Sequence, residues 1–160
     1  MKYPKRVKDL TATLDFYPEV IEMHQKASLF INDFAWCREV KNSTLYLNLG
    51  STICVFLLEI DNSASNEDNF LWIVVGDIPS MYLDVYGAKT TIEVLSRYNA
   101  LAKDWIFNVE HKLSINDCYP FYTEATMEMA YMLKKRVDFI EKTIIPNIDE
   151  IKLPPSFMAL

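Results

Sequence analysis

The residue types most often used for acid–base, nucleophilic and zinc chemistry are scarce in this sequence. It contains two histidines, His24 and His111, and three cysteines, Cys37, Cys54 and Cys118. Neither histidine has a cysteine or carboxylate at the spacing of a zinc motif, and no C-x-x-C pair occurs. Because the cysteines are odd in number and widely spaced, we expect free thiols rather than a disulfide framework.

Cys118 has the best position for a nucleophile among the cysteines. It comes shortly before a predicted helix start, where a thiolate would be stabilised, and His111 lies seven residues before it. No motif for an oxyanion hole accompanies the pair. Cys54 lies inside an apolar run that predicts a buried strand. The sequence therefore favours a non-enzymatic protein and predicts no catalytic residue.

Sites for metal ions and nucleotides are not predicted either. Asp61, Ser63 and Ser65 stand at the first, third and fifth positions of a calcium-loop pattern. However, Asn66 and Trp72 occupy the positions that require glycine and glutamate. The three glycines of the chain cannot form a dinucleotide-binding or Walker loop. We therefore expect no cofactor.

Charge is distributed unevenly along the chain. Sixteen lysines and arginines against 22 aspartates and glutamates leave a net charge of −6, which disfavours nucleic-acid binding. Residues 42–88 contain no lysine, arginine or histidine. Their acidic residues are Glu59, Asp61, Glu67, Asp68, Asp77 and Asp84. A surface of this sign attracts basic partners and speeds their association.

These carboxylates, with Tyr82 as an aromatic anchor, are the predicted interaction residues. The expected partner is a basic protein. A second explanation stays open, because strands buried on both faces leave little room for charge of either sign. A membrane is not expected as a partner, since the longest apolar run, 53–58, is far shorter than the roughly 20 residues of a span. No apolar stretch follows the basic N-terminus, so we expect a cytoplasmic protein.

The apolar pattern predicts the elements that must position these side chains. A first helix is expected to begin with Pro18 at its first position. The apolar stripe of this helix consists of Val20, Met23, Ala27, Phe30, Phe34 and Cys37. Alternation over 45–49 and the apolar run 53–60 predict a β-hairpin, and 70–75 predicts a third strand. Residues 80–86 fit either a short helix or a fourth strand at the sheet edge.

Two long helices are expected to follow the strands. Thr90 and Glu93 form a capping box for the first of them, and Thr123 is expected to cap the second. The apolar stripe of the last helix is Ala130, Leu133, Val137, Ile140 and Ile144, and Pro146 is expected to end it.

Together these elements predict a single α+β domain over residues 1–160. Three, or with 80–86 four, antiparallel strands form a meander packed against three long helices in the order α-β-β-β-α-α. Residues 1–16 are expected to form an N-terminal arm, for which strand and helix both stay open. Residues 151–160, which include two adjacent prolines, are expected to form an extended C-terminal tail.

Two motifs resemble those of a known family. Trp36 and Cys37 close the first predicted helix, and the third strand leads into Gly-Asp-Ile-Pro-Ser-Met-Tyr at 76–82 before a helix that contains Trp105. This pattern resembles an uncharacterised bacterial domain family with a W-C pair and a G-D-L-P-x-x-Y signature, over about residues 36–105. The chain departs from the family at 80–81 and lacks its His-Pro-Arg turn. The resemblance implies no activity.

The leading hypothesis is a non-enzymatic, cytoplasmic, protein-binding domain. Small acidic α+β domains are common among bacterial immunity proteins, so the concrete form is an antidote that blocks a basic partner. The alternative is a small-molecule-binding protein or enzyme with a pocket between sheet and helices, involving Asp77, Tyr82 and either His111 or Cys118. A homodimer joined through the last helix is a third hypothesis.

Overall fold

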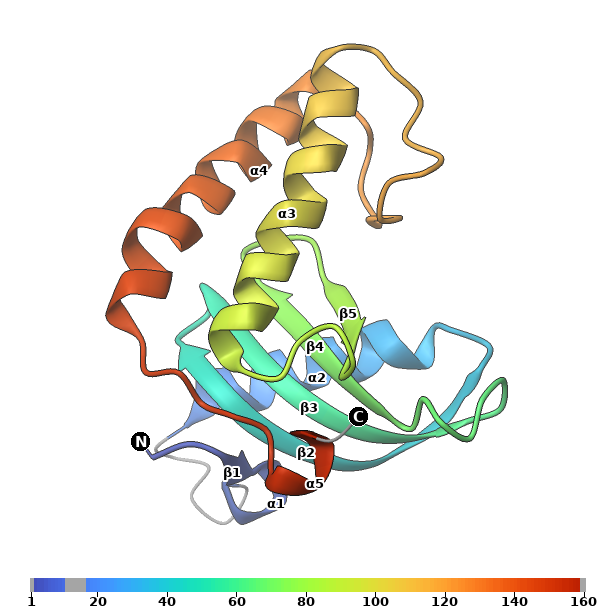
Figure 1. Ribbon diagram of the computed structural model, residues 1–160, viewed down its shortest axis with the longest axis vertical. Helices are drawn as coiled ribbons and strands as arrows, with labels where there is room; N and C mark the ends of the chain where they lie inside the picture. Colours follow the sequence, from blue (N-terminus) through green and yellow to red (C-terminus); the bar gives the residue numbers. More distant parts are fainter. Residues whose placement is uncertain (1, 11–16, 159–160) are drawn as a thin grey trace.

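The computed structural model describes residues 2–10 and 17–158, which form an antiparallel sheet with helices on both faces (Figure 1). Its strands, in spatial order, are β1 (Lys5–Arg6), β2 (Cys37–Leu49), β3 (Ile53–Asn62), β4 (Phe70–Gly76) and β5 (Met81–Asp84). The helices are α1 (Val7–Leu10), α2 (Pro18–Asn32), α3 (Thr91–Glu110), α4 (Met127–Phe139) and α5 (Pro155–Met158). The predicted α+β class is confirmed, whereas the predicted strand count and order of helices are not.

The two central strands are buried on both faces because helices cover the sheet from both sides. Val55 and Trp72 belong to the hydrophobic cluster formed with α3 and α4. Phe56 and Ile73 belong to the cluster formed with α2. Side chains alternate between the faces of a strand, so a slip of one residue in the β3–β4 register would exchange the two sets. This double burial explains the nearly continuous apolar sequence of both strands.

The first long helix begins as predicted but ends earlier. Pro18 occupies the first turn of α2, and the helix ends at Asn32. Its buried residues are Val20, Met23, Ala27 and Ile31. The predicted continuation of its stripe to Phe34 and Cys37 is wrong. Cys37 begins β2 and pairs with Asn62 of β3, so strand pairing with a distant part of the chain overrides the local helical spacing.

The sheet contains two strands in addition to the three predicted over 45–49, 53–60 and 70–75. Residues 81–84 form β5 at one edge, which decides between the two options for 80–86 in favour of a strand. At the other edge, β1 of the N-terminal arm pairs with Thr44 and Leu45 and is followed directly by α1. A strand of two residues carries no measurable periodicity, so the sequence could not predict it. The remainder of the predicted arm, 11–16, lies outside the described residues.

α3 and α4, on the face of the sheet opposite α2, follow the predicted patterns, except that the cap of α4 is Thr126 and not Thr123. The hydroxyl of Thr90 accepts a hydrogen bond from the Glu93 N–H at 3.1 Å, as expected of the cap of α3. The predicted cap at Thr123 is wrong: the Thr126 hydroxyl accepts from the Met129 N–H at 3.2 Å and begins α4. The chain first buries Phe121 in the core and enters the helix after it. All five residues of the stripe predicted for the last helix are buried. The last two of them lie on a π-helical turn, Ile140–Ile144, that continues α4.

The C-terminal segment packs against the start of α3. Lys152 forms a β-bridge with Thr90, and the Leu153 N–H donates to the Lys89 carbonyl at 2.9 Å. The ring of Phe157 lies 4.9 Å from that of Phe70, in an edge-to-face contact. The predicted extended tail is therefore wrong for 155–158, which form α5, and 159–160 lie outside the described residues.

The Gly-Asp-Ile-Pro motif has a structural explanation. Gly76 adopts a φ of +146°, which favours glycine, and the next N–H, of Asp77, donates to the Thr52 carbonyl at 3.0 Å. The Tyr98 hydroxyl donates to the Pro79 carbonyl at 2.7 Å. The motif thus joins the end of β4 to the β2–β3 turn and to α3.

Substituting Gly76 tests this explanation. A Cβ at this position would lie 2.1 Å from the Thr52 carbonyl oxygen. We expect Gly76→Ala to lower the free energy of unfolding by about 2–4 kcal/mol, measured by urea denaturation. Gly87→Ala is the matched control, because a Cβ there meets nothing closer than 3.6 Å. Equal stabilities of the two variants would contradict the steric argument.

Candidate functional site

The structure gathers five of the six predicted acidic residues at one end of the sheet. Glu59 pairs with Phe70 at the end where β3 turns into β4, and Gly76 pairs with Ile53 at the opposite end. The residues near the β3–β4 turn are Glu59, Asp61, Glu67, Asp68 and Asp84. Asp77 follows Gly76 and therefore lies at the other end, where its carboxylate is 2.6 Å from the Arg136 guanidinium. A single surface containing all six does not form.

Some of these carboxylates already have partners in the chain. Glu59 accepts a hydrogen bond from the Asn42 side chain, and Asp61 lies 3.9 Å from the Arg38 guanidinium. Among the residues that the structure describes, no lysine, arginine or histidine nitrogen lies within 4.0 Å of the carboxylates of Asp68 and Asp84. The same is true of Glu67, but only Asp68 and Asp84 line a cleft with aromatic side chains.

Asp68 and Asp84 line one cleft together with aromatic side chains. The cleft has a volume of about 330 Å³. Its lining residues are Trp36, Asn62, Ala64, Ser65, Asp68, Leu71, Tyr82 and Asp84. We call it the acidic aromatic cleft. It contains three of the predicted interaction residues, Asp68, Tyr82 and Asp84, and five that the prediction missed, among them Trp36 and Asn62.

The aromatic wall forms beside Tyr82 of β5, where Phe30 of α2 and the residues that follow this helix meet the tyrosine ring. Beyond the last turn of α2, Phe34 and Trp36 fold back onto Tyr82 of β5, with ring centroids 5.1 Å and 5.3 Å from the tyrosine ring. Phe34 and Trp36 stack on each other at 5.0 Å. Burial, followed by the neighbouring Tyr122, raises the pKa of Tyr82 above its ordinary value. The tyrosine therefore stays neutral and presents a hydroxyl and a ring face.

The acidic wall is held by hydrogen bonds to the backbone. Asn62 is 8% exposed. Its side-chain oxygen accepts hydrogen bonds from the N–H groups of Ala64 and Ser65, at 2.9 Å and 3.2 Å. Its side-chain amide donates to the backbone carbonyl of Asp68 at 3.0 Å. One oxygen of Asp84 accepts from two N–H groups of the following turn, at 2.9 Å and 2.8 Å. An asparagine that begins a polar loop is a signal for this kind of turn.

The chemistry of the acidic aromatic cleft is that of cation recognition. Carboxylates form charge-assisted hydrogen bonds with ammonium and guanidinium groups, and tryptophan and tyrosine faces attract the same cations. No described histidine, lysine or cysteine lines the cleft. Within the described residues, no group of three His, Cys, Asp or Glu side chains could hold a metal ion.

The two residues considered for nucleophilic chemistry are not brought into a catalytic arrangement. Cys118 is not at a helix start, because α4 begins only at Met127. Burial, and then the charges of Asp104 and Asp117, raise the pKa of the Cys118 thiol, which opposes thiolate formation. His111 ends α3, where its Nδ1 lies 2.8 Å from the Phe107 carbonyl oxygen.

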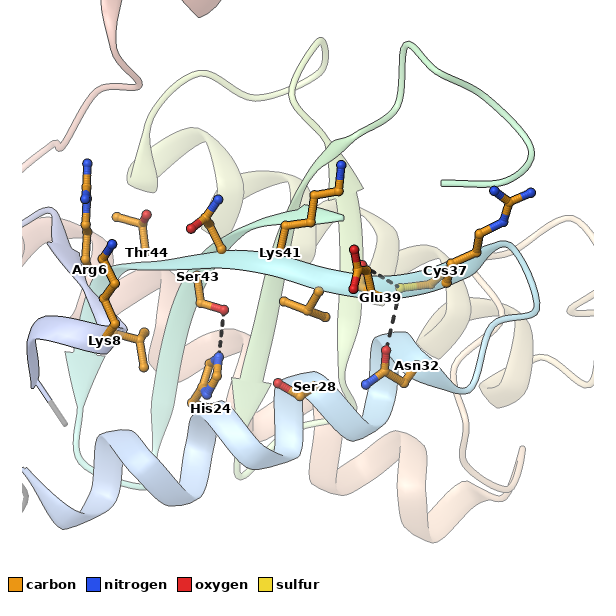
Figure 2. Close-up of a pocket in the computed structure, with 14 residues that line it drawn as sticks. Arg6, Lys8, His24, Ser28, Asn32, Cys37, Glu39, Lys41, Ser43 and Thr44 are labelled. Carbon is orange, nitrogen blue, oxygen red and sulfur yellow. Dashed lines mark hydrogen bonds between the residues drawn. The ribbon is translucent and has the colours of Figure 1, made fainter. Parts of the chain in front are cut away.

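A second concave surface runs along β2 (Figure 2). This groove, of about 920 Å³, lies beside α2 and the outer edge of β2. His24 of α2 reaches across it, with Nε2 2.7 Å from the Ser43 hydroxyl oxygen and its ring centroid 5.6 Å from that of Phe56. Burial lowers the pKa of His24 below its ordinary value, so the ring favours the neutral state.

Comparisons with known proteins do not identify a relative. No protein-family model matches the chain, and no curated protein or solved structure matches it. The resemblance of the W-C and G-D-x-P motifs to an uncharacterised bacterial family therefore stays a prediction. Within residues 2–10 and 17–158, no helix has the length and apolar character needed to cross a membrane.

The lowered pKa of His24 predicts a pH dependence of stability. The unfolded chain binds a proton at the ordinary pKa of 6.5, whereas the folded chain binds it only at lower pH. Stability from this group is therefore complete above pH 6.5 and decreases as the pH falls below that value. We expect His24→Gln to flatten the pH dependence of the free energy of unfolding between pH 5 and 7.5, measured by urea denaturation. Parallel curves for the two proteins would contradict the assignment.

Proposed function

We propose that this protein is a non-enzymatic binding protein whose acidic aromatic cleft receives a basic side chain of a partner protein. The observation that carries the proposal is the placement of Asp68 and Asp84 beside Trp36 and Tyr82 in one cleft, with no described lysine, arginine or histidine nitrogen within 4.0 Å of either carboxylate. Asp68 and Asp84 both lie on turns whose backbone is hydrogen-bonded, so binding a partner costs little conformational entropy there.

The net charge of −6 adds a long-range contribution to this recognition. Electrostatic attraction speeds the encounter with a basic surface, and the aromatic side chains supply contact area once the surfaces meet. In its concrete form, the protein is an antidote of the immunity type that covers a basic functional site of its partner. The partner's lysine or arginine would lie between the carboxylates and the Trp36 ring.

A small-molecule enzyme with a pocket between sheet and helices is less well supported. Trp72, Tyr98 and Trp105 are each at most 1% exposed and fill the centre of that interface. Asp77, which the pocket hypothesis included, pairs with Arg136, and both line a separate concave surface of about 270 Å³ at the end of β4. The interface therefore resembles a packed core rather than a ligand site.

A homodimer through the last long helix is a separate candidate that one observation favours. The outer side of α4 leaves Tyr131, Met132 and Phe139 exposed, at 63%, 41% and 45%. Large exposed apolar side chains on one helix are typical of association surfaces. Light scattering of the purified protein tests this candidate, and a monomer at all concentrations removes it.

The proposed function is tested by neutralising the cleft. Asp84→Asn keeps the oxygen that accepts from the following turn but removes the charge. Asp68→Asn removes the charge of the second carboxylate, in the loop between β3 and β4. We expect the double variant to bind the partner about tenfold more weakly than the unmodified protein. The partner is captured from native lysate at about 50 mM salt, released at about 500 mM, and its affinity measured by calorimetry.

The matched control changes the net charge equally at a distant surface. Glu124→Gln with Asp149→Asn also removes two exposed acidic charges, and both positions lie outside the acidic aromatic cleft. This control is expected to retain the affinity of the unmodified protein. Equal weakening of both double variants would mean that only net charge matters. An unchanged affinity of the Asp68→Asn/Asp84→Asn variant would overturn the proposal.

A further inference from the structure

One edge of the sheet is only partly paired. β1 pairs with Thr44 and Leu45 of β2, after which the chain turns into α1. Among the described residues, no strand pairs with the outer edge of β2 over 37–43. The 920 Å³ groove lies along this stretch, and Figure 2 shows β2 crossing it with α2 beneath. The groove therefore follows a strand edge that has room for one further strand.

The walls of the groove are polar. Figure 2 shows His24, Ser28 and Asn32 of α2 pointing toward β2, and Ser43 pointing back toward α2. On the opposite side of β2, Lys41 and neighbouring side chains point away from α2. A strand added at this edge would place its alternate side chains toward these two polar sides.

The charge along this edge is opposite to that of the whole protein. Four cations line the groove, namely Arg6, Lys8, Arg38 and Lys41, against one carboxylate, that of Glu39. The Arg38 guanidinium is 3.9 Å from Asp61 in an exposed pair, which is worth little in solvent. Within the described chain, Lys41 has no carboxylate within 4.0 Å. The groove is therefore complementary to acidic rather than basic groups.

The two cations of the unpaired stretch stand at irregularities of the strand. Cys37 and Glu39 pair with consecutive residues of β3, so Arg38 is an extra residue on β2. Lys41 is extra for the same reason, between Val40 and Asn42. The bulges limit regular pairing to the residues between them, and the two charges discourage pairing with an apolar strand.

We propose that the β2 edge over 37–43 binds an extended acidic segment of a partner protein, which adds to the sheet as a further strand. Backbone hydrogen bonds to β2 would supply the attraction common to such complexes. Carboxylates on one side of the added strand would meet Lys41 and Arg6, and polar side chains on the other would meet Ser28 and Asn32. This surface is separate from the acidic aromatic cleft and selects the opposite charge.

The test uses a fluorescein-labelled octapeptide of alternating glutamate and threonine, with anisotropy as the readout. A control peptide of the same sequence, N-methylated at every residue, keeps the charges but cannot donate backbone hydrogen bonds. We expect the N-methylated peptide to bind at least tenfold more weakly. Hydrogen exchange should show new amide protection within 37–43 when the unmethylated peptide is bound.

Two substitutions with the same charge change locate the binding surface. Lys41→Glu is expected to weaken binding of the peptide about tenfold, because it reverses the charge of an exposed side chain at the edge. Lys135→Glu on α4 is the matched control and should leave the affinity unchanged, as should Asp68→Asn with Asp84→Asn. Circular dichroism verifies that each variant is folded.

Several results would overturn the proposal. Equal binding of the two peptides would mean that backbone hydrogen bonds do not contribute and that the surface attracts any polyanion. Protection of amides outside 37–43, or no binding at about 1 mM peptide, would remove the strand-addition site. A dimer in light scattering that the peptide dissociates would assign the edge to a second copy of the chain instead.

Discussion

The double burial of β3 and β4 is the constraint on which the rest of the structure depends. Both strands carry apolar side chains on both faces, so water must be excluded from both sides of the sheet at once. On one side α3 and α4 do this with a large core around Trp72 and Trp105. On the other side α2 does this together with Val7 and Leu10 of α1 and the aromatic residues that follow α2.

Both candidate surfaces arise where this coverage is incomplete. α2 ends at Asn32, and beyond it Phe34 and Trp36 cover Tyr82 of β5 together with Phe30 of the helix. β1 ends at Arg6, so the outer edge of β2 continues without a paired strand among the described residues. A longer β1 would pair with the part of the β2 edge that lines the groove. The same short elements therefore limit packing and leave surface for binding.

The charges of the protein are separated in space as a result of the same burial. Strands with two apolar faces cannot carry charge, so carboxylates collect in the turn between β3 and β4 and at the end of β5. Cations collect along the unpaired stretch of β2 and on the adjacent β1 and α1. The net charge of −6 does not reveal this separation, because it is a sum over the acidic end and the basic edge.

Locally encoded features were determined by the sequence alone. The alternation and apolar run of β2–β3, the cap at Thr90 and the stripe of the last helix each depend on neighbours within a few residues. The acidic character of 42–88 is likewise a property of composition. These signals were sufficient for the α+β class and for the types of residues at the candidate site.

Only the tertiary structure decided which residues meet. Pairing of Leu71 with Asp84 brings the end of β5 beside the β3–β4 turn, whereas Asp77 of the same acidic region goes to the opposite end. The conversion of Cys37 from a helical position to the first residue of β2, and the pairing of β1, depend on strands far away in sequence. The physical reason is that hydrogen bonds between strands are satisfied by whichever distant segment the packing of both faces brings alongside.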